Sequence, residues 1–184
     1  MRLHNSSDRY GAVPQALHWV VALLVLLAWS LGTFGDVLPQ GSARATGLFI
    51  HISAGLAIAA LVAVRLAWRL GDPPPPAEHA PLGVWVDRAA RAAHWGLYAL
   101  LVAVPVAGIA LRLVHGDAVP VFGLFEIPSP WPLDRALTRS VKGIHELLAD
   151  ALMVLAGLHV AAALVHHWVF RDRTLLRMLP VSRG

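Results

Sequence analysis

The segment 141–170, VKGIHELLADALMVLAGLHVAAALVHHWVF, decides the fold because it is long, apolar and carries four histidines. As an α-helix it would be about 45 Å long, which is enough to cross a bilayer. Ionisable side chains at membrane depth are costly and usually mark a functional position. His145 and His159 are 14 residues apart, so they lie within roughly 40° on one helix face and about 21 Å apart along the axis. This spacing predicts two stacked sites inside one helical bundle.

The composition of the whole chain predicts an integral membrane protein. Of the 184 residues, 57% are hydrophobic and only 14% are charged, and the mean hydropathy is +0.62. Such values are typical of a chain that resides in lipid. We therefore expect an all-α, single-domain four-helix transmembrane bundle over residues 1–184. The four predicted spans and a surface cap lie at 15–35, 47–68, 92–114, 143–170 and 115–140, respectively.

The distribution of basic residues predicts the orientation of this bundle. Ten of the 15 lysines and arginines lie in or beside the N-terminal segment, the second connection and the C-terminal tail, and five lie near the other two connections. By the positive-inside rule both termini are cytoplasmic and the cap is periplasmic. The net charge of +4 does not predict nucleic-acid binding, because the basic residues flank apolar spans instead of forming one stripe.

The residue types available inside the spans limit the metal chemistry. Cysteine is absent, which excludes disulfides, thiolate nucleophiles, iron–sulfur ligation and covalent haem attachment. Met153 is the only methionine inside a predicted span, whereas the chain has ten histidines. Any metal held within the membrane must therefore be held by histidine. His4 and His79 fall in polar segments, where we expect them to be solvated.

Depth in the predicted bundle sorts five of the other histidines into two levels. His18, His94 and His159 fall near the cytoplasmic side, whereas His51 and His145 fall near the opposite surface. Two imidazoles that face each other at one level are what bis-histidine ligation of haem b requires. Zinc is the rival metal, but a structural zinc site usually has four ligands that converge on one point. The two-level division therefore favours haem.

Small neighbours indicate which histidines are ligands. A porphyrin edge needs space, and an alanine or glycine stands four residues after each of four histidines, on the same helix face. These neighbours are Ala22 after His18, Gly55 after His51, Ala149 after His145 and Ala163 after His159. His94 has Tyr98 in that position. We therefore interpret His94 as a hydrogen-bonding neighbour of the inner site, since a lone histidine in a span is more often a packing residue.

Four stretches of the sequence closely resemble the bacterial cytochrome b561 family. They are QALHWVVALLV (15–25), GLFIHISAGL (47–56), HWGLYALLVAVPVAGIAL (94–111) and KGIHELLADALMVLAGLHVAAALVHHWVFRDRTLLRMLP (142–180). Members of this family are four-helix dihaem b proteins of the bacterial inner membrane. The resemblance thus implies two haem b cofactors, an inner one on His18 and His159 and an outer one on His51 and His145.

The resemblance also implies an activity, superoxide oxidase. Superoxide is oxidised to dioxygen at the outer surface, and its electron crosses the two haems to ubiquinone. An anionic substrate needs a cationic approach, and the basic residues on that side are Lys142, Arg139, Arg135 and Arg44. Lys142 lies one turn before His145 and is the strongest candidate, followed by Arg139. The alternative for these residues is ordinary contact with lipid headgroups, or pairing with haem propionates.

For the quinone end, the resemblance points to the second histidine of the pair after the inner site. His167 is therefore the first candidate and His166 the second. An interfacial imidazole can donate a hydrogen bond and supply a proton near neutral pH. The alternative interpretation is that residues 166–168 form part of an aromatic belt.

A second class of function stays open on the sequence. The chain is also compatible with a b-type electron-transfer subunit that links a hydrogenase-like or dehydrogenase-like partner to the quinone pool. Such a subunit requires a broad docking face, whereas a self-contained enzyme requires a compact basic pocket under the cap. A haem-free transporter or scaffold would have no reason for histidines paired at two levels.

Overall fold

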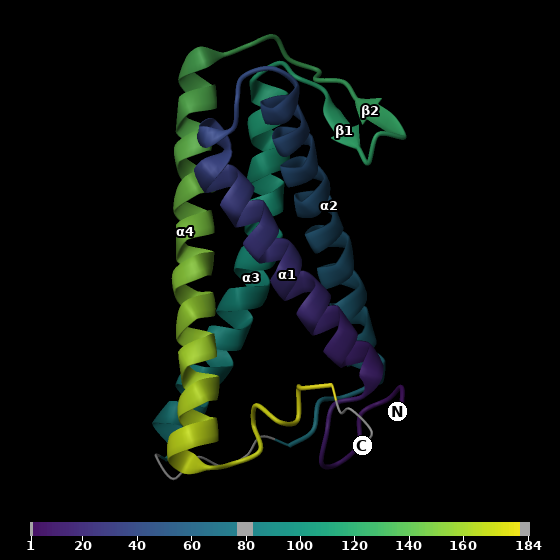
Figure 1. Ribbon diagram of the computed structural model, residues 1–184, viewed down its shortest axis with the longest axis vertical. Helices are drawn as coiled ribbons and strands as arrows, with labels where there is room; N and C mark the ends of the chain where they lie inside the picture. Colours follow the sequence, from purple (N-terminus) through teal and green to yellow (C-terminus); the bar gives the residue numbers. More distant parts are fainter. Residues whose placement is uncertain (1, 77–82, 181–184) are drawn as a thin grey trace.

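The computed structural model describes residues 2–76 and 83–180 and contains four long helices that form one bundle (Figure 1). Each helix is long and apolar enough to cross a bilayer. The helices are α1 (Ala12–Phe34), α2 (Ser42–Gly71), α3 (Val84–Val114) and α4 (Arg135–Val165). A short 3₁₀ turn, η1 (Gly35–Val37), follows α1, and a π-helical turn, η2 (His166–Phe170), continues α4. The prediction of an all-α four-helix membrane bundle is confirmed.

The helices extend beyond the apolar runs that predicted them. The predicted spans lie within the longer elements, and α3 and α4 each begin eight residues before the predicted start, at Val84 and Arg135. The first turn of α4 is capped by Asp134, whose Oδ1 atom accepts hydrogen bonds from the backbone N–H groups of Ala136 and Leu137 at 2.9 and 3.0 Å. An apolar run marks only the part of a helix that lies in hydrocarbon. Prediction from hydropathy therefore omits the charged, capped turns that extend the helix beyond the membrane.

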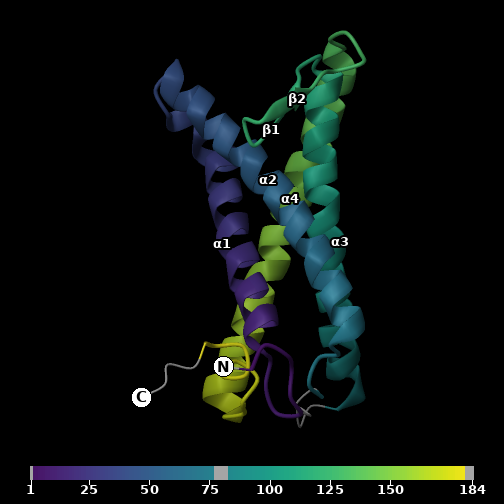
Figure 2. The ribbon, with the colours of Figure 1, turned by 90° about the vertical axis from the view of Figure 1, so that its right-hand side faces the viewer.

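The helices pack chiefly as two pairs, α1 with α2 and α3 with α4 (Figure 2). Contacts between α2 and α3 join the two pairs. One small buried cluster takes side chains from all four helices: Val21, Ile58, Val62, Leu101 and Leu152. Leu152 lies seven residues from both His145 and His159. The cluster therefore contains the residue of α4 that lies midway between the two histidine levels.

Residues 115–140 contain a two-stranded antiparallel hairpin that the sequence did not predict. Strand β1 (Val119–Val121) pairs with β2 (Phe125–Ile127), and Val121 lies opposite Phe125. The turn uses positive φ angles at Phe122 (53°) and Gly123 (72°), of which only the glycine adopts such an angle without strain. Strands of three residues are too short to show an alternating pattern. The hairpin lies beside the upper end of α2 (Figure 1).

The opposite end of the bundle is closed by the N-terminal segment and residues 171–180 (Figure 1). The carbonyl of Met178 accepts a hydrogen bond from Trp19 Nε1 at 2.9 Å, and the carbonyl of Arg177 accepts one from Gln15 Nε2 at 3.1 Å. The chain therefore enters α1 and leaves α4 at the same end, as four spans require. That this end is cytoplasmic stays a prediction from the distribution of charge.

Candidate functional site

The structure brings histidines from different helices together at two levels. At one level, His18 of α1 and His159 of α4 have ring centroids 6.3 Å apart and ring planes inclined by 69°. At the other, His51 of α2 and His145 of α4 have centroids 6.1 Å apart and planes inclined by 81°. Helix α4 therefore contributes one ring to each pair.

Both separations fit two imidazoles on opposite sides of one metal ion. A bond from a metal to an imidazole nitrogen is about 2 Å long, and the ring centroid lies about 1.1 Å behind that nitrogen. Two such rings in line across the metal therefore have centroids about 6.3 Å apart. The centroid separations of 6.3 Å for His18 with His159 and 6.1 Å for His51 with His145 match this value.

The rings of His51 and His145, the level predicted to be the outer one, are held by backbone carbonyls. His51 Nδ1 lies 2.8 Å from the carbonyl oxygen of Ala28, and His145 Nδ1 lies 3.1 Å from that of Val104. A carbonyl only accepts, so each Nδ1 carries the proton and donates it to this bond. Each Nε2 is then left with a free lone pair, which is the usual arrangement of a histidine that binds a metal.

Two glycines make room for the same two rings. Gly32 and Gly108 each follow the accepting carbonyl by four residues, one turn along the helix. A Cβ atom built on Gly32 would lie 3.1 Å from Cε1 of His51, and one on Gly108 would lie 3.1 Å from Cε1 of His145. Such contacts are tighter than normal van der Waals separation, so a methyl group would push the ring away. In a chain rich in glycine and alanine, no sequence signal distinguishes these two positions.

His94 lies beside the inner pair. Its ring centroid is 5.3 Å from that of His159 and the planes are inclined by 73°, which is closer than two ligands across a metal. Within residues 2–76 and 83–180, no group of three or more histidine, aspartate or glutamate side chains is arranged to hold a metal ion. The three inner histidines are therefore not arranged as a multi-ligand centre of the zinc type.

The basic residues at the hairpin end of the bundle, the predicted outer end, differ in whether an acidic side chain lies beside them. Lys142 Nζ lies 3.4 Å from a carboxylate oxygen of Glu146, and both side chains are mostly exposed. Arg44 lies 3.6 Å from the carboxylate of Asp36 and also donates a hydrogen bond to the Asp36 carbonyl. Both cations therefore have an acidic partner on the same surface.

Arg135 and Arg139 have no such partner. Both side chains are exposed in the first turns of α4, and neither takes part in an ion pair with a described residue. Arg112, in contrast, is held 2.6 Å from the carboxylate of Asp117. The most available positive charge at this end therefore belongs to Arg135 and Arg139.

The two histidines after the inner level have different surroundings. His166 Nδ1 lies 2.5 Å from Asp172 Oδ2. Burial raises the pKa of Asp172, but hydrogen bonds from His166 and Thr174 outweigh this effect and hold the pKa below its ordinary value. His167 makes no hydrogen bond to a described residue, and its ring centroid lies 6.2 Å from that of Trp168. The carboxylate thus fixes His166, whereas the polar atoms of His167 remain available.

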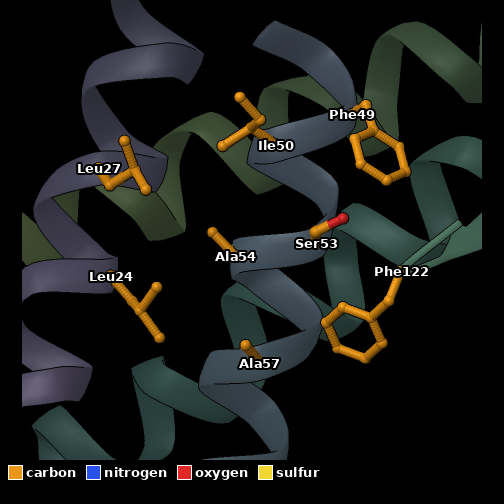
Figure 3. Close-up of a pocket in the computed structure, with 8 residues that line it drawn as sticks. All are labelled: Leu24, Leu27, Phe49, Ile50, Ser53, Ala54, Ala57 and Phe122. Carbon is orange, nitrogen blue, oxygen red and sulfur yellow. The ribbon is translucent and has the colours of Figure 1, made fainter. Parts of the chain in front are cut away.

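An apolar pocket of about 290 Å³ lies on α1 and α2 beside the hairpin (Figure 3). Its lining residues are Leu24, Leu27, Phe49, Ile50, Ser53, Ala54, Ala57 and Phe122. The only polar side chain among them is Ser53, whose hydroxyl has no hydrogen-bond partner among the described residues. Neither His51 nor His145 lines this pocket, so it is separate from the paired histidines.

Of the two histidines expected in polar segments, the structure describes His4, which lies at the surface. The side chain of His4 is 70% exposed, and its ring stacks on that of Trp68 with centroids 5.2 Å apart. His4 is therefore exposed, as predicted, but it also packs against the end of α2. His79 lies outside the described residues.

Comparisons with known proteins cover the whole of this architecture. A family profile described as prokaryotic cytochrome b561 matches residues 9–181. The chain is 37% identical over 176 residues to a protein of Yersinia pestis named probable superoxide oxidase CybB, with 96% of this chain and 98% of that protein covered. It is 32% identical over 187 residues to cytochrome b561 homolog 2 of Escherichia coli (strain K12), with 99% and 97% covered.

Proposed function

The chain belongs to the prokaryotic cytochrome b561 family. We propose that it binds two haems b and passes electrons from superoxide, on the periplasmic side of the membrane, to ubiquinone. As a member of this family it is a b-type cytochrome of electron transport and a multi-pass protein of the bacterial inner membrane. The dihaem proposal rests above all on the ring separations of 6.3 and 6.1 Å at two levels of one bundle.

Four histidines would hold the two groups. His18 and His159 would bind the inner haem, and His51 and His145 the outer haem. Haem b with two histidine ligands supplies transfer of one electron at a time. The two α4 histidines lie about 21 Å apart along the helix axis, which covers most of a hydrocarbon core about 30 Å thick. The two levels are therefore suited to carry an electron across the membrane.

The outer surface suits an anionic donor. Arg135 and Arg139 are exposed and unpaired with described residues, and Lys142 lies one turn from His145. Positive charge at the mouth of a site raises the rate at which a small anion arrives. Oxidation of superoxide to dioxygen removes one electron and needs no proton, so steering and exclusion of larger molecules are the main tasks of these residues. The name of the Yersinia pestis relative supports this substrate.

The inner surface suits a quinone. Reduction of one ubiquinone to ubiquinol takes two electrons and two protons, and therefore two superoxide anions. His167 has uncommitted polar atoms with which to donate a hydrogen bond to a quinone oxygen. The adjacent pair of His166 and Asp172 offers a route for protons from the aqueous side.

A second candidate function is that of an electron-transfer subunit which docks a redox partner. The observation that favours it is an exposed apolar surface on the cap. Its large side chains are Leu124, Phe125, Ile127 and Trp131, all of them exposed. Such a surface is typical either of a protein interface or of the membrane–water boundary.

One experiment separates the two functions. Purified protein is mixed with a source of superoxide and with ubiquinone, and quinol formation and haem reduction are followed by absorbance. We expect quinol to appear without a partner protein and to disappear when superoxide dismutase is added. A His145→Ala variant should lose the outer haem and this activity. Haems that dithionite reduces but superoxide does not would favour the subunit, and fewer than two haems per chain would rule out the dihaem proposal.

A further inference from the structure

Helix α2 carries a basic residue, Arg65, on the side that faces the inner histidines. The Cζ atom of Arg65 lies 5.6 Å from the ring centroid of Tyr98 on α3. Tyr98 lies one helical turn after His94 on α3, so this contact places Arg65 close to the level of the inner histidines. Arg65 therefore lies beside the inner level and within the membrane-spanning part of α2.

The positive charge of Arg65 lacks a negative partner. None of the ion pairs in residues 2–76 and 83–180 includes Arg65. Tyr10 is a nearby group that can ionise to an anion. Burial raises the pKa of its phenol, and the charges of Arg69 and Arg65 only partly oppose this effect. The Tyr10 phenol is therefore neutral at physiological pH. A charged side chain in a span normally pairs with an opposite charge, so the guanidinium of Arg65 is available to an anionic partner.

The position of Arg65 indicates which kind of molecule carries its anionic partner. Arg69, one turn further along α2, is exposed and can reach lipid phosphates at the surface. The guanidinium of Arg65 is half-buried and lies over Tyr98, inside the bundle. A partner inside the bundle at this level must belong to whatever the inner histidines hold.

We propose that Arg65 binds a propionate carboxylate of the inner haem. This inference rests on the proposed function, because it requires a haem between His18 and His159. A guanidinium presents a planar pair of N–H donors that matches the two oxygens of a carboxylate, and the ring of Tyr98 holds that plane in position. Arg65 is then a positioning residue. Its charge stabilises the reduced form of the inner haem relative to the oxidised form, because reduction removes one positive charge beside it.

The test uses the purified holoprotein with two readouts. Haem propionates are labelled with ¹³C at their carboxyl carbons by feeding labelled aminolaevulinic acid to the cells. Redox-induced infrared difference spectra then report the labelled carboxylates, and a potentiometric titration reports the inner haem, assigned with His145→Ala. For Arg65→Gln we expect the labelled band to move and the reduction equilibrium to shift about tenfold toward the oxidised form, about 59 mV for one electron. The matched control, Arg69→Gln, should leave the labelled band unmoved.

Each other outcome overturns the inference. A shifted equilibrium with an unmoved labelled band would mean that Arg65 acts by charge alone, and no change in either would assign Arg65 to lipid or to Tyr98. If Arg65→Gln does not accumulate, Arg65→Lys replaces it, because lysine keeps the charge but not the planar fork. An unmoved band in that variant also overturns the inference. Failure of the proposed function is separate, since the wild-type protein would then show fewer than two haems.

Discussion

The Nδ1 atom of His145 lies 3.1 Å from the backbone carbonyl oxygen of Val104, so α3 fixes the ring that α4 presents to the outer site. The same relationship holds in the other helix pair, where His51 is fixed by the carbonyl of Ala28 at 2.8 Å. Each helix pair therefore supplies one of the two rings and the carbonyl that supports it. This level of the bundle thus consists of two halves, each of which orients its ring by a contact within its own helix pair.

The first prediction concerns the glycine behind each outer ring. Replacing Gly108 by alanine puts a methyl group 3.1 Å from Cε1 of His145, so the ring must rotate and its bond to Val104 weakens. Changes to such supporting contacts typically weaken metal binding by about 10- to 100-fold. We expect Gly108→Ala to lose the outer haem on dilution or gel filtration, measured as haem per protein by pyridine haemochrome absorbance.

The control for this prediction is Gly143→Ala. Gly143 lies on α4 two residues before His145, on the opposite helix face, and a Cβ there would meet nothing within 4 Å. This variant should retain both haems. Equal haem content in Gly108→Ala and Gly143→Ala would show that the outer ring does not depend on its glycine.

The second prediction separates a ligand from its neighbour at the inner level. His94 lies 5.3 Å from His159, closer than two ligands across a metal. We expect His94→Leu to keep two haems per chain and His159→Leu to keep only the outer one, measured by haem content and by the reduced absorbance spectrum. Loss of the inner haem in His94→Leu, with retention in His18→Leu, would exchange the roles of His94 and His18.

The third prediction concerns electrostatic steering. Replacing Arg135 and Arg139 together by glutamine removes exposed charge that no described carboxylate compensates. We expect the second-order rate constant for haem reduction by superoxide to fall about tenfold at low ionic strength and to lose most of its salt dependence. The matched control is Arg112→Gln, since Arg112 is already paired with Asp117. Equal rates in the two variants would assign Arg135 and Arg139 to lipid headgroups.

The fourth prediction concerns pH and the segment 171–180. The pKa of Asp172 is lowered in the folded protein by hydrogen bonds that outweigh burial. Its contribution to stability is therefore fully present above the ordinary aspartate pKa and is lost as the pH falls through the lower, folded value. A hydrogen bond to a charged group contributes about 1.5 kcal/mol or more. At neutral pH, Asp172→Asn should therefore exchange the amide hydrogens of this segment about tenfold faster.

The measurement is hydrogen exchange followed by mass spectrometry, with peptides from α2 as the internal reference. In the wild-type protein the same peptides should lose protection only at strongly acidic pH. Unchanged exchange in Asp172→Asn would show that the bonds from Trp19 and Gln15 hold the segment without the carboxylate.

The sequence determined the class of fold and the depth of the histidines. Apolar runs of about 20 residues have few solutions other than membrane-spanning helices, since every backbone polar group must be paired within lipid. The 14-residue spacing of His145 and His159 set two levels on one helix, because helical rise and rotation are nearly constant. The boundaries of α3 and α4 and the hairpin of β1 and β2 were missed. The start of α4 depends on the cap at Asp134 and the hairpin on its turn, and hydropathy reports neither.

Only the tertiary structure decided which groups support each histidine. Every residue carries a backbone carbonyl, so the sequence cannot select Val104 as the partner of His145, 41 residues away. The rotation of α3 about its axis and its close approach to α4 make that selection, and Gly108 permits it. The same holds for Arg65, whose charge is evident in the sequence but whose position over Tyr98 depends on how α2 meets α3. Local rules fix the depth of a side chain, whereas the packing of helices against each other fixes its neighbours.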